Sequence, residues 1–207
     1  MAYTAIDDAG LFFNTVLYTG TGSSNAVTGV GFQPDFTWIK SRSNAYAQGL
    51  TDSVRGVKET LFSNTNGAEV TYDYGLTAFG ADGFTVISDN IFNASGPTYA
   101  SWNWKAGTTS GITTNGSTTI TPSSYSFNQT SGFSVLKYTG NSTSGAGLAH
   151  GLGVKPGFLI MKKTNSAGDN WQIYHQSVGY SNSGDLALNT TSGQGAQTNF
   201  SGEPDAT

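Results

Sequence analysis

Two histidines, His150 and His175, are the side chains of this 207-residue chain with the clearest capacity for acid–base chemistry near neutral pH. A catalytic triad would need one of them beside an activated serine and an acid. Neither histidine lies in a nucleophile-elbow sequence, and the absence of cysteine excludes thiol catalysis, disulfides and zinc thiolates. We therefore expect no catalytic residue, and both histidines are interpreted as turn or strand-edge residues.

The 13 acidic residues could in principle supply the two facing carboxyl groups of a glycoside hydrolase. They are scattered through turn-like sequence, for example at Asp7, Asp8, Asp73, Asp82 and Asp89. Turn formation is the favoured interpretation, because Asp side chains bond to nearby backbone amides, and an acid pair is the alternative. The same oxygens could bind calcium, but no loop has EF-hand spacing, so no metal or cofactor is expected.

The tryptophans are the residues best suited to a sugar ligand, because aromatic faces stack on pyranose rings. Trp102 and Trp104 share one face of a strand at period two. Burying such a side chain contributes about 1.5–3 kcal/mol, which favours a place in the core. Ligand contact is the alternative, and the candidate ligand-binding residues are Trp38, Trp102, Trp104 and Trp171.

Charged residues make up only 11% of the chain, and the net charge is −4. The nine Lys and Arg residues do not cluster, which argues against nucleic-acid binding. Arg55 follows Asp52 in Asp52-Ser53-Val54-Arg55-Gly56, and a structural ion pair or turn clamp is favoured over a ligand contact. No segment approaches the length that spans a membrane.

The elements that would position these residues are predicted to be short strands. No segment has a convincing helical period, 13% of residues are aromatic, and 28 glycines supply turns. The segment 50–62 is expected to form two strands around Gly56, with one strand plus a helical turn as the alternative. The clearest predicted strands are Leu11–Tyr18, Phe36–Lys40, Phe84–Ile87, Thr98–Lys105 and Phe133–Tyr138.

Part of the chain is repeated. Tyr18-Thr19-Gly20, Gly31–Lys40 and Leu61–Thr65 have counterparts at 138–140, 153–162 and 186–190. The offset drifts from 120 (138 − 18) through 122 (156 − 34) to 125 (186 − 61), as expected for a duplicated module with small insertions. We expect an all-β fold of two tandem β-sandwich or jelly-roll-like modules. Residues 1–107 would form the complete module, 108–130 a Gly/Ser/Thr-rich linker or a short hairpin at Asn115-Gly116, and 131–207 an incomplete copy.

A resemblance to a known group of proteins rests on motifs spread over most of the first module. They are Met1-Ala2-Tyr3-Thr4, Ile6-Asp7-Asp8, Tyr18-Thr19-Gly20, Gln33-Pro34-Asp35 with Trp38-Ile39-Lys40, Asp52–Gly56, Asp82–Val86 and Trp102–Gly107. With these motifs the chain resembles the repeat-containing virion proteins of tailed bacteriophages, especially those of marine bacteria, which are tail-fibre-like or lectin-like. The resemblance implies no catalytic residues.

The expected function is therefore that of a structural virion protein, in a tail fibre or other external appendage that mediates attachment or assembly. The alternatives are a head decoration protein and, less favoured, a polysaccharide-degrading appendage enzyme. The N-terminus lacks a basic, apolar signal sequence, so we expect synthesis in the host cytoplasm and incorporation into the virion. Expected partners are other virion proteins, further copies of the chain, with a trimer favoured, and host surface glycan, but neither nucleic acid nor a membrane.

Overall fold

The computed structural model describes residues 6–178, 186–191 and 204–206. These residues form an all-β fold, and the one helix among them is a short 3₁₀ turn, η1 (Ala9–Leu11). The strands of the first half are β1 (Phe13–Thr19), β2 (Asn25–Thr28), β3 (Phe36–Ser41), β4 (Gln48–Asp52), β5 (Glu59–Phe62), β6 (Val70–Thr71), β7 (Leu76–Gly80), β8 (Gly83–Val86) and β9 (Thr98–Trp104). Those of the second half are β10 (Thr118–Ile120), β11 (Ser124–Asn128), β12 (Phe133–Lys137), β13 (Gly147–Leu148), β14 (Phe158–Met161), β15 (Gln172–His175) and β16 (Leu186–Ala187).

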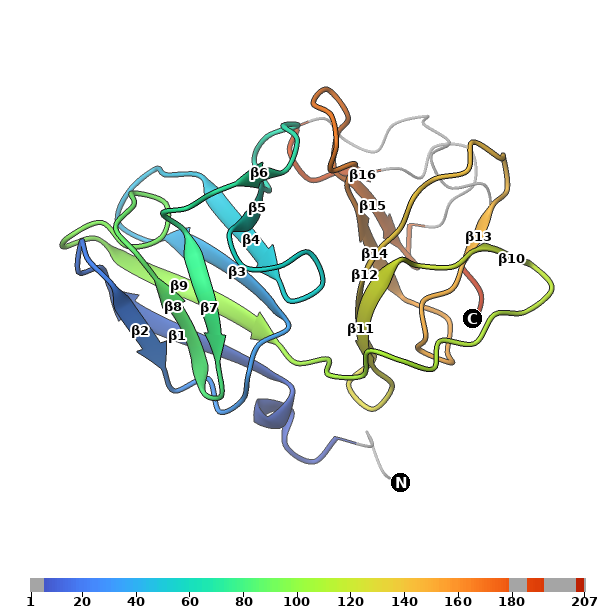
Figure 1. The fold of residues 1–207 in the computed structure, drawn as a ribbon, viewed down its shortest axis with the longest axis horizontal. Helices are drawn as coiled ribbons and strands as arrows, with labels where there is room; N and C mark the ends of the chain where they lie inside the picture. Colours follow the sequence, from blue (N-terminus) through green and yellow to red (C-terminus); the bar gives the residue numbers. More distant parts are fainter. Residues whose placement is uncertain (1–5, 179–185, 192–203, 207) are drawn as a thin grey trace.

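Two sheets pack face to face in the first half (Figure 1). One has six strands in the order β1-β9-β3-β4-β5-β6, and the other has three in the order β2-β8-β7. The core between them is built from Val27, Ile39, Leu76, Phe84, Val86, Phe92 and Tyr99. Gly49 is needed here because the ring of Phe92 packs against it, so closely that an added Cβ would lie 2.3 Å from the ring.

The opposite face of the six-stranded sheet carries the larger aromatic residues. Side chains alternate along β3, so Ile39 points into the first core while Trp38 points away from it. Part of this outer face packs against the second half of the chain. The shared core contains Leu50, Leu61 and Trp171, with Phe36, Trp38 and Ile160 packed around them.

The second half consists of three small sheets: β11-β12, β14-β15-β16 and β10-β13. The Asn115-Gly116 turn leads into β10, which pairs in parallel with β13 and so does not form a hairpin with its neighbour. β11 pairs with β12 in antiparallel register. The two groups of sheets lie side by side, and the contacts between them join the halves into one packed body (Figure 1).

Most of the strands predicted from period two are confirmed with shifts of one or two residues at their ends. The segment 50–62 forms β4 and β5 on either side of Gly56, so the two-strand prediction is confirmed. Gly56 itself has φ +112°, a conformation that an L residue rarely adopts.

Candidate functional site

The outer face of the six-stranded sheet brings three of the four candidate tryptophans together. Trp38 of β3 lies directly opposite Trp102 of β9, with ring centroids 6.4 Å apart in an edge-to-face arrangement. Trp104 is two residues further along β9 and lies 4.8 Å from Phe13 and 6.0 Å from Phe133. All three tryptophans are half-buried.

This face is only partly covered. β1 lies beside β9 at the sheet edge, with Thr15 opposite Trp102 and Leu17 opposite Ala100. Leu17 is 59% exposed, and Thr15 is exposed as well. We call the surface formed by Leu17, Thr15, Trp102 and Trp38 the aromatic face. Leu17 and the accessible part of Trp102 are the apolar groups that this face offers to a ligand, since Trp38 also packs against the shared core.

Trp171 has a different environment. It is 4% exposed and belongs to the shared core with Leu50 and Leu61. Its indole N–H donates to the carbonyl oxygens of Phe62 at 3.1 Å and Thr65 at 3.0 Å. Because both its ring and its N–H are engaged within the protein, Trp171 joins the two halves and offers no surface to a ligand.

Arg55 forms the predicted structural ion pair. Its Nε donates to Asp52 Oδ2, its Nη1 to Glu69 Oε2 at 2.8 Å, and its Nη2 to the carbonyl of Leu50 at 3.0 Å. The side chain is 7% exposed. Asp52 also caps the turn by accepting from the Val54 and Arg55 amides. The guanidinium therefore fixes the β4–β5 connection, and the prediction of an ion pair and turn clamp is confirmed.

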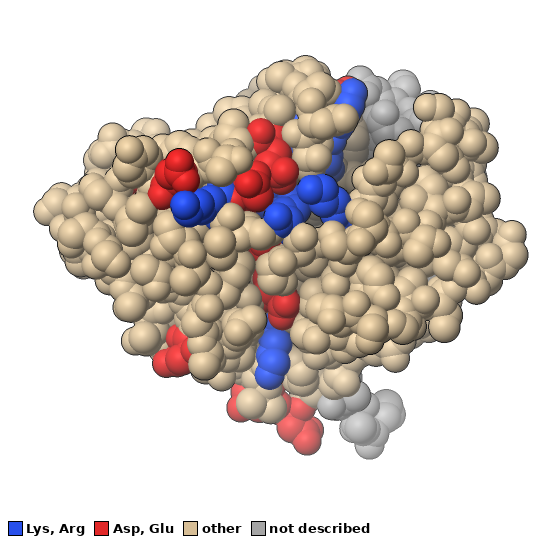
Figure 2. All heavy atoms as spheres, in the orientation of Figure 1, with Lys and Arg blue, Asp and Glu red and all other residues tan. Residues whose placement is uncertain are grey.

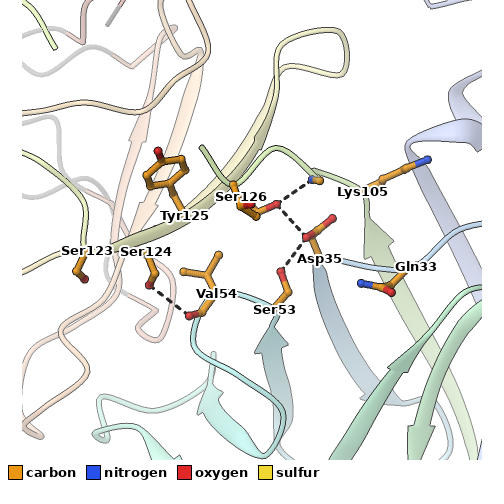
Figure 3. A pocket seen from close by; sticks show the side chains of 11 residues that line it. Gln33, Asp35, Ser53, Val54, Lys105, Ser123, Ser124, Tyr125 and Ser126 are labelled. Carbon is orange, nitrogen blue, oxygen red and sulfur yellow. Dashed lines mark hydrogen bonds between the residues drawn. The ribbon is translucent and has the colours of Figure 1, made fainter. Parts of the chain in front are cut away.

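A cavity of about 560 Å³ lies where loops of the first half meet β11 (Figure 3). Most of the side chains around it are hydroxyl, amide or charged groups, a lining that suits a polar ligand. The lining residues are Gln33, Asp35, Ser53, Val54, Lys105, Gly107, Thr109, Ser123, Ser124, Tyr125 and Ser126. We call this site the hydroxyl cavity.

Asp35 holds the wall of the hydroxyl cavity together. Its Oδ1 accepts from the hydroxyl groups of Ser53 at 2.8 Å and Ser126 at 2.9 Å, and its Oδ2 accepts from the Ala106 amide at 2.8 Å. Figure 3 shows Asp35 between the two serines, which come from different halves of the chain. The carboxylate is 7% exposed and is engaged on both oxygens. It acts as a structural hub, and this geometry leaves it poorly placed to act as a general base.

The remaining polar groups of the cavity include both donors and acceptors. The hydroxyl groups of Ser123 and Ser124 donate to backbone carbonyls, so their oxygens keep lone pairs for a ligand. Gln33 and Lys105 carry side-chain donors that are not bonded to any other described residue. A surface that mixes donors and acceptors, with a single ammonium group, suits a neutral polyhydroxylated ligand better than a strongly charged one.

The hydroxyl cavity was not predicted from the sequence. Its two sides are 91 residues apart at the Asp35–Ser126 bond, and Ser and Thr are too frequent in this chain for any one of them to stand out. The available signal was Asp35 itself, an acid placed between a proline and a buried strand.

The two histidines lie in separate segments, and the carboxylates of Asp52 and Glu69 converge on Arg55. His150 contacts the carbonyl of Asp205 at 3.2 Å, and His175 ends β15. Within the described residues, no three His, Asp or Glu side chains are grouped as for a metal ion. Asp8 and Asp89 accept from the amides two residues further on, Gly10 and Ile91, as predicted for turns. Asp82 instead accepts from the amides of Gly29 and Gly31 in a distant loop, and these hydrogen bonds lower its pKa.

Charged side chains gather along the boundary between the two halves, whereas the rest of the visible face is nearly free of charge (Figure 2). The ion pairs in the described part of the chain include those of Arg55, Lys58 with Asp73, and Lys163 with Asp169. Uncharged residues therefore make up most of this face.

The fold and the two surfaces define a charge-poor, all-β protein with an aromatic sheet face and a hydroxyl-lined cavity. The chain belongs to the family described as a domain of unknown function, DUF7483, whose model matches residues 8–207. Neither the curated proteins nor the solved structures contain a match to this chain. None of the helices in the described residues is long and apolar enough to cross a bilayer.

Proposed function

We propose that this chain is a structural protein of a tailed-phage virion, in a tail fibre or another external appendage, that attaches the particle to host surface glycan. The observation that carries the proposal is the aromatic face, where the half-buried Trp102 lies edge to face with Trp38 and beside β1, which carries the exposed Leu17. The hydroxyl cavity is a separate site whose polar lining suits sugar hydroxyl groups. The assignment to a phage virion rests on the resemblance of the sequence motifs to those of phage virion proteins.

The proposal includes two tandem modules, the second built on the same strand pattern as the first. In support, β3-β4-β5 are consecutive neighbours in one sheet, and β14-β15-β16 are consecutive neighbours in another. β3 and β14 begin at Phe36 and Phe158, which are related by the repeat offset of 122 (158 − 36). The Thr108–Phe127 bridge and β11 lie in the segment between the modules.

We also propose that several copies act together, with a trimer as the favoured assembly. Single sites on an open, shallow face bind sugars weakly, and linked copies gain avidity through effective concentration. A closed ring of identical subunits satisfies every interface. The oligomeric state is measured by light scattering at micromolar concentration, and a strict monomer would contradict this part of the proposal.

The test of attachment is a glycan array screened with the protein displayed multivalently on beads. Neutral glycans should bind, and Trp102→Ala should lose most of that signal. Thr77→Ala, a half-buried control in β7 of the other sheet, should retain it. Signal lost in EDTA would indicate calcium, signal lost in high salt would indicate charge-driven recognition, and silence throughout would refute glycan attachment.

The two alternative functions predict different outcomes. A head decoration protein would occur in hundreds of copies per particle and would be located on the capsid by immunogold labelling. A polysaccharide-degrading enzyme would shorten the glycans that it binds, and chromatography of the incubated oligosaccharides would reveal the products.

A further inference from the structure

The outer edge of β14 is open as far as residues 6–178, 186–191 and 204–206 are concerned. Among the strands that the structure describes, β14 pairs with β15 alone. The Gln176 amide donates to the Gly157 carbonyl at 2.9 Å, so Gly157 and Gln176 form a hydrogen-bonded pair of this antiparallel ladder. Because the ladder alternates, the amides of Phe158 and Ile160 point away from β15. Neither amide has a partner among the described residues.

In the first half of the chain, the corresponding edge belongs to β3 and is paired with another strand. β3 corresponds to β14 at the repeat offset of 122, and β3 pairs with β9 along this edge. In that pairing Phe36 lies opposite Trp104 and Trp38 lies opposite Trp102. The fold therefore already contains one example of the strand that this edge accommodates.

The repeat relates two tyrosines, Tyr18 and Tyr138, whose side chains contact different partners in the two halves. The ring of Tyr18 stacks on Tyr99 of β9, with centroids 5.1 Å apart and an interplanar angle of 14°. Tyr138, the counterpart of Tyr18, instead places its hydroxyl 2.8 Å from the sulfur of Met161 in β14. Tyr138 therefore contacts β14 itself, whereas Tyr18 contacts the strand that pairs with β3.

The edge also has the chemistry of a pairing surface. β14 consists of four apolar residues without a charge, and Phe158 is 53% exposed. Unpaired, uncharged edges are templates for an added strand, and soluble proteins usually protect them with charge or proline. Lys162 and Lys163 follow the C-terminal end of β14. In a strand placed like β9, the residue equivalent to Lys105 would lie at the other end of β14, beside Gly157, and so away from these two lysines.

We propose that the outer edge of β14 binds a β-strand of the same kind as β9, supplied by another polypeptide, and that this strand completes the second sheet. The partner segment is extended and uncharged over about seven residues, the length of β9, with two aromatic side chains two positions apart. They would lie opposite Phe158 and Ile160, in the places that Trp104 and Trp102 take beside β3. The inference rests on the tandem modules proposed above and adds the kind of partner that the second one binds.

The experiment adds a synthetic peptide with the sequence of residues 98–105 to the full, ¹⁵N-labelled chain. Hydrogen exchange of the Phe158 and Ile160 amides should slow by at least about tenfold at saturating peptide, because both amides become hydrogen-bonded. A scrambled peptide of the same composition should have no effect.

Two N-methylated peptides of equal mass provide the matched control. In β9 the Thr98 carbonyl accepts from Arg42, so the amides of Ala100 and Trp102 face β3, whereas those of Ser101 and Asn103 face β1. Methylation at Ala100 and Trp102 should abolish binding, and methylation at Ser101 and Asn103 should preserve it. Equal binding by the two peptides, or no binding by the unmodified one, would overturn the proposal.

A chain variant provides a second test. Ile160→Pro removes one of the two outward amides and should abolish peptide binding if circular dichroism shows the fold retained; if it does not fold, the peptide pair decides alone. Retained binding by folded Ile160→Pro, or slowed exchange at β1 instead of β14, would contradict the proposed edge. Slowing that depends on protein concentration without peptide would mean that a second copy fills the edge. Glycan binding is measured separately, so its failure leaves this result intact.

Discussion

Trp171→Phe should destabilise the whole chain, because Trp171 links the two halves. The replacement removes the indole N–H that donates to the carbonyl oxygens of Phe62 and Thr65. The Phe62 carbonyl keeps the Thr65 amide at 3.2 Å, so the loss falls mainly on the Thr65 carbonyl. Thr65 is an exposed residue, so water can reach its carbonyl, and the lost hydrogen bond costs about 0.5–1.5 kcal/mol. The smaller ring leaves space beside Leu50 and Leu61, which adds about 1–2 kcal/mol.

The expected loss in the free energy of unfolding is therefore about 1.5–3.5 kcal/mol. For a chain of this size the urea m-value is about 2–3 kcal/mol/M, so the midpoint should fall by about 1 M. Far-UV circular dichroism during urea titration measures it, and Trp102→Phe is the control. Trp102 is half-exposed and its indole N–H has no partner among the described residues, so its replacement should cost less than about 1 kcal/mol. Equal midpoints for the two variants would refute the reasoning.

Three further substitutions test other parts of the fold. Arg55→Met leaves two largely buried carboxylates, one of them Asp52, without their cation and should cost about 3–5 kcal/mol; a thermal midpoint near that of the wild type would contradict the assigned ion pairs. Gly49→Ala places a methyl group against the Phe92 ring and should cost about 1–3 kcal/mol in urea unfolding, whereas an unchanged midpoint would mean that the ring moves freely. Asp82→Asn tests acid stability: hydrogen bonds lower the pKa of Asp82, so the stability that it contributes is present above its ordinary pKa of 3.8 and is lost as the pH falls through the lowered value. The variant should lack this acid-induced loss, and parallel pH profiles for variant and wild type would argue against it.

Local signals in the sequence were sufficient for the strands. Period-two alternation located β3 and β9, and Asp82-Gly83 marked the turn before β8. The ion pair of Arg55 with Asp52 was also predictable, since a separation of three residues in a turn brings the two side chains together.

Contacts between distant segments were not predictable in the same way. Trp171 donates to the carbonyl of Phe62, 109 residues away, and nothing near either residue in the sequence indicates that pairing. The hydroxyl cavity depends likewise on Asp35 meeting Ser126. Among the tryptophans, composition alone could not separate Trp171 in the core from Trp102 at the surface, because the difference depends on which part of the sheet the second half covers.

The Asp35 hub has a consequence for how the protein is made. Ser53 and the Ala106 amide leave the ribosome well before Ser126, which lies 91 residues after Asp35. At about 5–20 residues per second, synthesis of that interval takes roughly 5–18 s. During this time the carboxylate has only part of its native hydrogen bonding, and water must supply the rest. Closure of the first sandwich against its neighbour is therefore a late step of biosynthesis, and a chain released before Ser126 would carry a charged, hydrated gap at the end of β3.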